Sequence, residues 1–492
     1  MRARYVMGID LGGGGGRCLV LDADTGTSVM SNRAWTHTRV QAYWPWAFDL
    51  DVDLVWRAVG EMSREVLARS RIAAADVAAI GIASMRHGMI VIDAGGSSLF
   101  ATPTLDARAG VIALQLSNDR GEEIYRHTGR WPNPILSAVR LLWLAEHAPA
   151  TLARASAALG LADWLGFRLS GFKTTSRTLA GESMVYSLEQ QAWDDDLIAS
   201  LGLPRHLCPD LLDAGTTIGG LSEDAAQHLG LKAGIPVVSA GADTQCSLLA
   251  MGAVAPGHVS VVTGTTASVM AVTSEPSLDP HKRLWTGVHA VPGCYVLESN
   301  AGAMGRTLDW LATAWYADAP TPVAALCAEA AAVPPGAYGV LSTAGAHLFD
   351  ATALSLPTDT LAFSATSATG DAAGRAAMAR AVLEGMAYAV RANVEQVQRV
   401  SGQPLDEIGL TGGMARSAVW AQLVSDVLGS RVRVGPTTKA AAHGAALCAA
   451  VGVGLHPDLT TAGEHPFRAT HVYTPDAASA AGYLSRYESW RA

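Results

Sequence analysis

The stretch MGIDLGGGGGRCLVLDADTG, residues 7–26, places a run of glycines between two short apolar segments. Each apolar segment ends in turn residues, so together they predict two buried strands joined by a hairpin. Asp10 precedes the glycines and Arg17 follows them. Glycine leaves the backbone N–H groups of a turn open to phosphate oxygens, and an acid beside them can hold Mg²⁺ through water. The stretch therefore predicts either a phosphate-binding hairpin or an ordinary flexible turn.

Two other glycine-rich phosphate motifs do not fit this loop. The dinucleotide fingerprint G-x-G-x-x-G, counted from Gly12 or Gly13, requires glycine where the chain has Arg17 or Cys18. The P-loop requires a lysine directly after its last glycine, and this loop has none. A hairpin between two strands remains as the interpretation.

A second stretch, GHVSVVTGTTASVMAVTSEP at 257–276, repeats the pattern of two β-rich runs around a glycine-containing turn. Elsewhere strand-like and helix-like segments alternate, and apolar residues recur at helical spacing over 51–70 and 375–400. Residues 410–429 predict a strand, a glycine turn and a helix. This alternation predicts an α/β chain with an internal duplication.

Length and composition indicate the number of domains and the class of partner. A chain of 492 residues exceeds one ordinary core, so we expect two domains, 1–254 and 255–492, divided where Gly and Pro interrupt the pattern at 252–257. The apolar share of 49% is enough for folded cores. The net charge of −9, without runs of like charge, argues against nucleic acid and for a small-molecule partner.

The other compositional signals favour a cytoplasmic protein. The six cysteines include no C-x-x-C pair, so they predict buried reduced thiols rather than a zinc site. The first residues, MRARYVMGID, lack a long apolar segment, and we therefore expect no signal peptide. Apolar windows such as AALCAAVGVGL at 445–455 are shorter than the roughly 20 residues that span a bilayer, so we expect no membrane partner.

The two hairpins, together with the glycine turn TGGMARS at 411–417, resemble the superfamily of actin, hexokinase and the heat-shock ATPases. That resemblance implies an α/β fold of two duplicated ribonuclease H-like domains, the actin-like ATPase fold, with ATP in the interdomain cleft. Within the superfamily the chain is similar to the FGGY carbohydrate kinases. Four segments carry the similarity, in this order: ATPTLDARAG (101–110), LSAVRLLWLAEH (136–147), PVVSAGADTQCSLLAMGAVAPG (236–257) and LTGGMARSAVWAQLVSDVLG (410–429).

The FGGY resemblance implies a phosphotransferase that uses ATP and Mg²⁺, with Asp243 as the catalytic base. A sugar hydroxyl needs a carboxylate to take its proton as the bond to phosphorus forms. The implied substrate-binding residues are Arg86, His87, Asp106, Asp243 and Gln245, and the implied metal-side acids are Asp10 and Asp243. The implied ATP-binding residues are Gly12, Gly13, Gly14, Gly15, Arg17, Gly264, Thr265, Thr266, Gly412, Gly413 and Ser417.

Most of these residues also have an ordinary structural interpretation. The alternatives are a helix N-cap for Asp243, a turn for Asp10, a β-turn for Thr265 and Thr266, a strand-to-helix turn for Gly412 and Gly413, a buried hydrogen bond for His87, and a surface charge for Arg86.

The chain departs from the family pattern at three places. Gly13 and Gly15 stand where family members usually have Thr and Ser, so phosphate binding there would rely on backbone N–H groups. We therefore expect Gly13→Thr combined with Gly15→Ser to preserve or tighten MgATP binding. Lys439 replaces a glutamate before the last glycine turn, and Ala242 replaces a glycine beside Asp243.

The stretch SMRHG at 84–88 bears on the substrate. Its ending resembles the xylulokinases, whereas its beginning resembles the kinase of the linear quorum-sensing autoinducer, a dihydroxypentanedione. We expect a sugar kinase whose leading substrate is a ketopentose such as xylulose, followed by the linear autoinducer or a polyol. The alternative of another class is a regulatory ATPase on the same fold without kinase activity. The resemblance also makes a homodimer an expected assembly.

Overall fold

The glycine-rich stretch forms the predicted hairpin at the start of the first sheet. β1 (Tyr5–Gly12) and β2 (Gly15–Asp22) pair antiparallel with Gly12 opposite Gly15, so the turn consists of Gly13 and Gly14. The structure is a computed structural model that describes residues 5–43, 45–353, 361–365, 374–404, 406–435, 439–464 and 471–491.

The hairpin belongs to a six-stranded mixed sheet in the N-terminal lobe, ordered β14–β15–β6–β1–β2–β3. Its remaining strands are β3 (Ser28–Ala34), β6 (Val77–Ser84), β14 (Thr217–Gly220) and β15 (Pro236–Ala242). β1, β6 and β15 are parallel, and Asp10 lies opposite Ala83, which lies opposite Gly241. Because parallel strands end at the same edge of a sheet, the segments that follow β6 and β15 lie beside the glycine turn.

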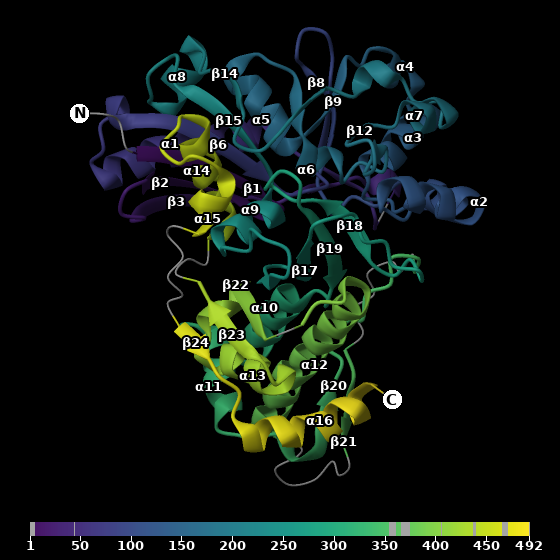
Figure 1. Cartoon of the computed structure of the whole chain (residues 1–492), viewed down its shortest axis with the longest axis vertical. Coiled ribbons are helices and arrows are strands. Elements are labelled where there is room, and N and C mark those ends of the chain that lie inside the picture. The colour runs from purple at the N-terminus through teal and green to yellow at the C-terminus, as the bar shows by residue number, and fades with distance from the viewer. Residues whose placement is uncertain are drawn as a thin grey trace.

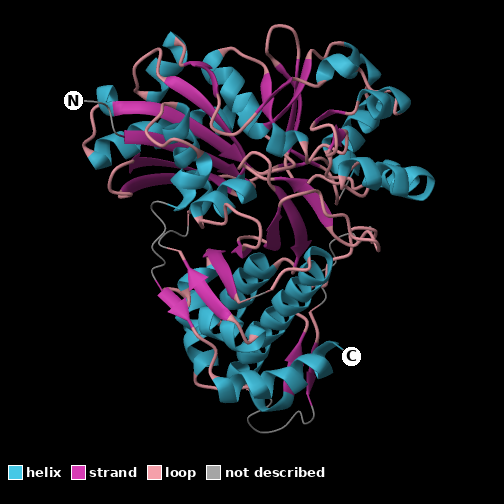
Figure 2. Cartoon of the chain, viewed as in Figure 1, coloured by secondary structure: helices cyan, strands magenta, loops and turns pink. Residues whose placement is uncertain are grey.

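A seven-stranded sheet in the C-terminal lobe repeats this arrangement in the order β18–β19–β17–β16–β22–β23–β24. Its strands are β16 (Val259–Thr263), β17 (Ala267–Thr273), β18 (Trp285–Val288), β19 (Tyr295–Asn300), β22 (Glu407–Gly412), β23 (Arg431–Val434) and β24 (His471–Tyr473). β16–β17–β19 corresponds to β1–β2–β3, and β22–β23–β24 corresponds to β6–β15–β14. The predicted duplication is confirmed, and Figure 2 shows the two sheets in separate lobes.

Helices cover both sheets, and two of them, α1 (Val52–Ser70) and α12 (Arg375–Ser401), were predicted from apolar spacing. α1 packs on β2 and β3, and Asp51 caps it by accepting a hydrogen bond from the Leu54 N–H at 2.9 Å. α5 (Leu161–Ser170) and α8 (Glu223–Leu229) complete this layer. In the C-terminal lobe, α12 matches the helix expected over 375–400 and packs on β17 and β19. It contacts α11 (Pro322–Ala331), α13 (Ala418–Leu428) and α16 (Ala477–Arg491), and α10 (Met304–Trp315) packs against α11.

An insertion between β6 and β14 enlarges the N-terminal lobe. Its main elements are β7 (Met89–Ile92), β8 (Ser98–Thr102), β9 (Ala157–Gly160), α2 (Gly110–Thr128), α3 (Ser137–His147) and α6 (Arg177–Ala180). The short elements of the chain are β4 (Thr38–Arg39), β5 (Phe48–Asp49), β10 (Thr174–Ser176), β11 (Tyr186–Ser187), β12 (Ala192–Trp193), β13 (Asp210–Leu212), β20 (Val340–Ser342), β21 (Phe363–Ala365), α4 (Pro149–Ala153) and α7 (Asp195–Ser200). Across the described ranges, no helix has the length and apolar character needed to cross a membrane.

Two helices from the C-terminal half pack on the N-terminal sheet. α14 (Ala440–Gly452) lies against β1, β6, β15 and α9 (Asp243–Ala250), and α15 (Leu459–Glu464) lies beside it (Figure 1). The helix approaches the strands closely, because a Cβ at Gly8 would lie 2.0 Å from the Ala442 carbonyl oxygen and one at Gly81 would lie 1.8 Å from that of Ala445. A division at residue 254 thus separates the two sheets, but the N-terminal lobe also contains later residues.

Candidate active site

A cavity of about 1040 Å³ lies between the two lobes. Its volume is sufficient for a nucleotide. The edge of the first sheet, the turn after β16 and the turn after β22 form its walls. The predicted site residues that line it are Asp10, Arg17, Asp243, Gly264, Thr265, Gly412, Gly413 and Ser417. The fold therefore brings these predicted residues together, whereas Gly12, Gly13, Gly14, Gly15 and Thr266 are not among the residues that line the cavity, and their contact with ATP stays a prediction.

Asp10 and Asp243 lie in the wall of this cavity and influence each other's charge. Burial raises the pKa of Asp10, while Arg17 and then Lys439 oppose the rise. Burial and then the charge of Asp10 raise the pKa of Asp243 to about 7, while Arg86 opposes the rise. A carboxylate with a pKa near neutrality is suited to accept a proton from a hydroxyl group.

The carboxylate of Asp243 is not the cap of the helix that it begins. Ala242 occupies the N-cap position of α9, and Asp243 accepts a hydrogen bond from the Thr244 N–H at 2.8 Å. The backbone just before Asp243 requires glycine at position 241, because its φ is +89° and a Cβ there would lie 2.1 Å from Thr178 Oγ1. Ala242 has a φ of −72°, which suits any residue, so its departure from the family pattern leaves the turn intact.

The two carboxylates fit a magnesium ion. Oδ2 of Asp10 accepts a hydrogen bond from Arg17 at 2.9 Å, whereas Oδ1 is buried without a partner. Among the residues that the structure describes, no group of three or more His, Cys, Asp or Glu side chains forms a metal site. In phosphoryl-transfer sites Mg²⁺ binds through one or two carboxylates together with water and phosphate oxygens, so a pair of acids is enough.

The first hairpin has room for a side chain in its turn, at Gly13 and Gly14, but not at Gly15, where β2 begins. A Cβ at Gly13 or Gly14 meets no atom within 4 Å. At Gly15 a Cβ would lie 2.4 Å from the carbonyl oxygen of Arg33 on β3. A serine at 15 would therefore clash with β3, and the expected effect of the combined Gly13→Thr and Gly15→Ser substitution on MgATP binding stays a prediction.

The second glycine turn, Gly264 to Thr266, joins β16 to β17. Gly264 donates a backbone hydrogen bond to the carbonyl of Thr266 at 2.9 Å. Gly264 and Thr265 line the cavity, whereas Thr266 does not. The N-terminus of α10 approaches closely, because a Cβ at Gly305 would lie 2.1 Å from the Gly264 carbonyl oxygen. A helix N-terminus carries partial positive charge, which favours phosphate in this part of the cavity.

The third turn links β22 to α13. Gly412 has a φ of +99°, and a Cβ there would lie 2.1 Å from the Thr263 carbonyl oxygen, so the packing of β22 on β16 requires glycine. Ser417 caps α13 by accepting a hydrogen bond from the Trp420 N–H at 3.3 Å. Gly413 has open space around its Cβ position. Strand packing thus explains the glycine at 412, and helix capping explains the serine at 417. Both residues also line the cavity, together with Gly413.

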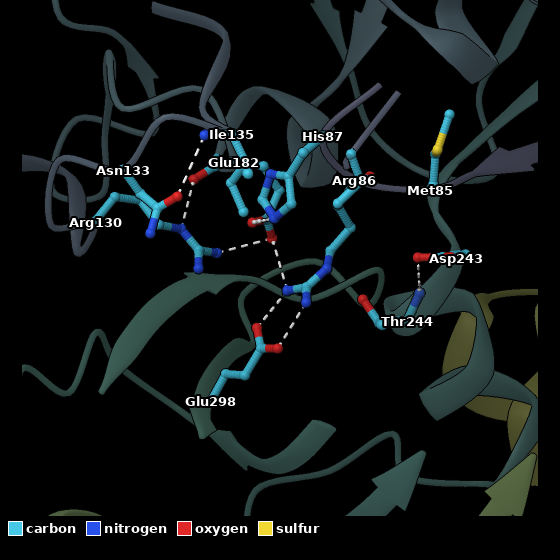
Figure 3. Close-up of polar contacts among 12 residues, drawn as sticks. Met85, Arg86, His87, Arg130, Asn133, Ile135, Glu182, Asp243, Thr244 and Glu298 are labelled. Carbon is cyan, nitrogen blue, oxygen red and sulfur yellow. Dashed lines mark hydrogen bonds and ion pairs between the residues drawn. The ribbon is translucent and has the colours of Figure 1, made fainter. Parts of the chain in front are cut away.

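Beside Asp243 lies a cluster of buried charges that comes from both lobes (Figure 3). Arg86, two residues after the end of β6, donates from both terminal nitrogens to Glu298 on β19, with Nη2 2.7 Å from Oε1. Glu182, which follows α6, lies 3.5 Å from Nη1 of Arg86 and accepts a hydrogen bond from Arg130 at 2.8 Å. The predicted substrate residue Arg86 is therefore not a surface charge, and it connects the two lobes.

His87 and Gln245 belong to the same cluster. Nε2 of His87 lies 3.8 Å from Oε2 of Glu182, and neither ring nitrogen of His87 has a hydrogen-bond partner. Burial and then the charge of Arg86 lower the pKa of His87 well below its ordinary value, so the ring is neutral at pH 7. Gln245 on α9 donates to Glu182 Oε1 at 3.4 Å. Two further predicted substrate residues thus meet at Glu182.

Asp106 lies apart from this cluster. It is fully buried, and its carboxylate accepts hydrogen bonds from the Phe48 N–H at 3.0 Å and from Arg108 at 2.8 Å. Arg140 donates to the backbone carbonyls of both Asp106 and His87. Asp106 therefore supports the loop that carries His87, and its direct contact with a substrate stays a prediction.

Several residues that the geometry brings to the site were not predicted from the sequence. Lys439, noted only as a departure from the family pattern, lines the cavity together with Arg306 and Arg416. Glu182 and Glu298 lie in segments without a recognisable motif. An acid within a β-rich, mostly apolar stretch, YVLESN at 295–300, was the available signal for Glu298.

Comparisons with known proteins agree with this geometry. Residues 5–250 match the model of the N-terminal domain of the FGGY family of carbohydrate kinases, and residues 259–453 match that of the C-terminal domain. An autoinducer-2 kinase of Salmonella typhimurium is 30% identical over 99% of this chain and 93% of its own. A xylulose kinase from Rhodospirillum rubrum has a TM-score of 0.84 at 26% identity, over 99% of this chain and 98% of its own. A gluconate kinase from Lactobacillus acidophilus shares the fold, with a TM-score of 0.86 at 21% identity over 99% and 96% of the two chains.

Fold and site define a phosphotransferase built on the two-domain, actin-like ATPase architecture. The chain belongs to the FGGY family of carbohydrate kinases. This membership favours a sugar kinase over the regulatory ATPase that the sequence left as an alternative.

Proposed function

We propose that the chain transfers the γ-phosphoryl group of MgATP to a hydroxyl of an open-chain polyhydroxy carbonyl compound of four or five carbons. The position of Asp243 supports this most directly, because it lies in the cavity wall near Asp10 and next to the cluster around Arg86. The linear autoinducer is the first candidate, since a relative named for it is 30% identical over nearly the whole chain. Xylulose is the second, so the order expected from the sequence is reversed.

ATP would occupy the cavity, with its adenosine at the Gly412–Ser417 turn and its phosphates toward the two hairpins. Arg17 and Lys439 line the cavity near Asp10 and supply positive charge for the phosphates. Asp10 would hold Mg²⁺, which contributes charge neutralisation at the phosphate oxygens when bound. Because the cell supplies ATP in the cytoplasm, we also propose that location.

Asp243 acts as the general base in this proposal. As the substrate oxygen attacks the γ-phosphorus, its proton passes to the Asp243 carboxylate. The unpartnered nitrogens of His87 and the unpartnered Oε2 of Glu182 are suited to hydrogen-bond the remaining hydroxyls. The ion pair of Arg86 with Glu298 holds the lobes together around the substrate and excludes water from the transferring group.

An ADP-release assay on the purified protein with a substrate panel tests this function. The panel contains the linear dihydroxypentanedione, xylulose, erythrulose, glycerol and xylitol, each with MgATP. We expect the pentanedione or xylulose to raise ADP release at least about tenfold above the rate without acceptor, because a bound hydroxyl replaces water as the acceptor. Equal ADP release with every compound and with buffer alone would overturn the proposal.

A further inference from the structure

Two positive and two negative side chains balance each other inside the cluster beside Asp243. Arg86 pairs with Glu298 through both terminal nitrogens, and Arg130 pairs with Glu182 at 2.8 Å. All four side chains are at most 9% exposed. Burial tends to raise the pKa of Glu298, but Arg86 and then Arg130 hold it below its ordinary value, so this carboxylate is ionised. The cluster is therefore neutral as a unit.

A ligand at this position meets groups that suit hydroxyls rather than charges. The buried atoms left without a partner include both ring nitrogens of His87, Oε2 of Glu182 and Nη1 of Arg130, whose charge Glu182 already balances. An added carboxylate would find the Arg86 guanidinium already occupied in a bidentate pair and would lie near the carboxylate of Asp243. Burying an anion where both guanidinium groups already have carboxylate partners is costly, because no unbalanced positive charge compensates for its desolvation.

We infer that Glu298 determines substrate specificity: by neutralising Arg86, it restricts the kinase to uncharged polyhydroxy substrates and excludes aldonates of the same length. This inference rests on the proposed function. Glu298 comes from β19 of the C-terminal lobe, so the charge of Arg86 in the N-terminal lobe is neutralised by a residue of the other lobe. Arginine readily recognises carboxylates through a bidentate pair, so removing the charge at 298 frees Arg86 for that role.

The test compares kcat/KM for xylulose and for xylonate, a five-carbon aldonate, in variants that separate charge from shape. Glu298→Gln removes the charge at nearly constant volume, and Glu298→Asp keeps the charge on a shorter side chain. Glu407→Gln is the matched control, because Glu407 lies in the same lobe at the opposite end of β22 from Gly412 and pairs with Arg431 and Arg433. We expect the ratio of xylulose to xylonate to fall at least about tenfold in Glu298→Gln, roughly 1.4 kcal/mol of discrimination, and to persist in the two other variants.

The double variant Arg86→Gln with Glu298→Gln removes both charges and should restore discrimination against xylonate relative to Glu298→Gln alone. An equal loss of both activities in Glu298→Gln, with the ratio unchanged, would overturn the inference and leave Glu298 a structural bridge. Wild-type protein that uses xylonate as well as xylulose would overturn it too.

Binding measurements separate this inference from the proposed function. Titration calorimetry of xylonate and xylitol into the protein without nucleotide reports charge selectivity without turnover. Gain of xylonate binding in Glu298→Gln supports the role of Glu298 even where no panel compound is phosphorylated. Absence of that gain refutes it even where xylulose is a good substrate.

Discussion

Arg17 donates a hydrogen bond from Nη1 to Oδ2 of Asp10 at 2.9 Å, across the first hairpin, where the two residues are register partners on β1 and β2. The pair lies at the cavity and leaves the second carboxylate oxygen of Asp10 without a partner. It opposes the rise that burial imposes on the pKa of Asp10. The hairpin thus places Arg17 where its charge and its hydrogen bond favour the ionised form of Asp10 at the cavity.

Replacing Arg17 tests this pairing. Arg17→Met should raise the pKa of Asp10 further, because the charge and the hydrogen bond that lower it are both lost. We expect the KM for ATP to increase about tenfold and the pH dependence of ATP binding to move to higher pH. Arg17→Lys keeps the charge and should lose less. An unchanged KM in Arg17→Met would remove Arg17 from the nucleotide site.

Asp243→Asn tests the base. We expect kcat to fall by about 10²–10⁴-fold while ATP binding, measured by calorimetry, is retained. In the wild-type enzyme, kcat/KM should fall as the pH drops through about 7, because protonated Asp243 accepts no proton. This acid limb is read from a pH series with the best acceptor. A variant that turns over at the wild-type rate would contradict the assignment.

The ionised Asp243 carboxylate should favour activity but lower the stability of the fold, so stability should fall over the pH range in which activity rises. The pKa of Asp243 in the folded chain, about 7, lies above its ordinary value of 3.8, so the native state binds this proton more tightly than the unfolded state. The buried carboxylate therefore destabilises the fold progressively as the pH rises between these two values. We expect Asp243→Asn to have a higher Tm than wild type at pH 8, with the difference shrinking toward pH 4. An equal difference in Tm at both pH values would argue against a shifted Asp243.

Single substitutions at Gly13, in the turn of the first hairpin, and at Gly15, at the start of β2, should differ in their effect on stability. Gly13→Thr places a hydroxyl where the structure has open space, and we expect MgATP binding to be preserved or tightened. Gly15→Ser forces a Cβ against the Arg33 carbonyl oxygen and should lower the free energy of unfolding by about 1–3 kcal/mol. Urea unfolding and ATP titration of each variant measure these effects. Similar stability for both variants would mean that β3 yields at position 15.

The contact of α14 with the first sheet should depend on glycine. Gly81→Ala pushes a Cβ to 1.8 Å from the Ala445 carbonyl oxygen, and we expect a loss of about 3 kcal/mol in the free energy of unfolding. Gly110→Ala is the control, because its Cβ position at the start of α2 is open, and it should change stability by less than about 0.5 kcal/mol. Chemical unfolding compares the two. Equal stability would show that α14 is not tightly packed.

Local patterns in the sequence predicted much of the fold. Apolar residues at helical spacing predicted α1 and α12, and β-prone runs around glycine predicted both hairpins. These elements are predictable because their period and their turns depend on residues close together in the chain. The family motif placed Asp243 at the junction of a strand and a helix, where the structure has it.

Contacts between distant segments required the tertiary structure. Glu298 is 212 residues from Arg86, and no spacing within the sequence reports that the second sheet brings its carboxylate to the end of β6. The space at Gly15 depends on β3, and the place of α14 depends on its approach to Gly8 and Gly81. The sequence alone determined the duplicated α/β architecture and the glycine turns, because each is encoded locally, whereas Asp243 was predicted from the resemblance to a family motif. The tertiary structure decided which charges that acid meets and which of them are already paired, because electrostatic energy depends on distance in space and on burial.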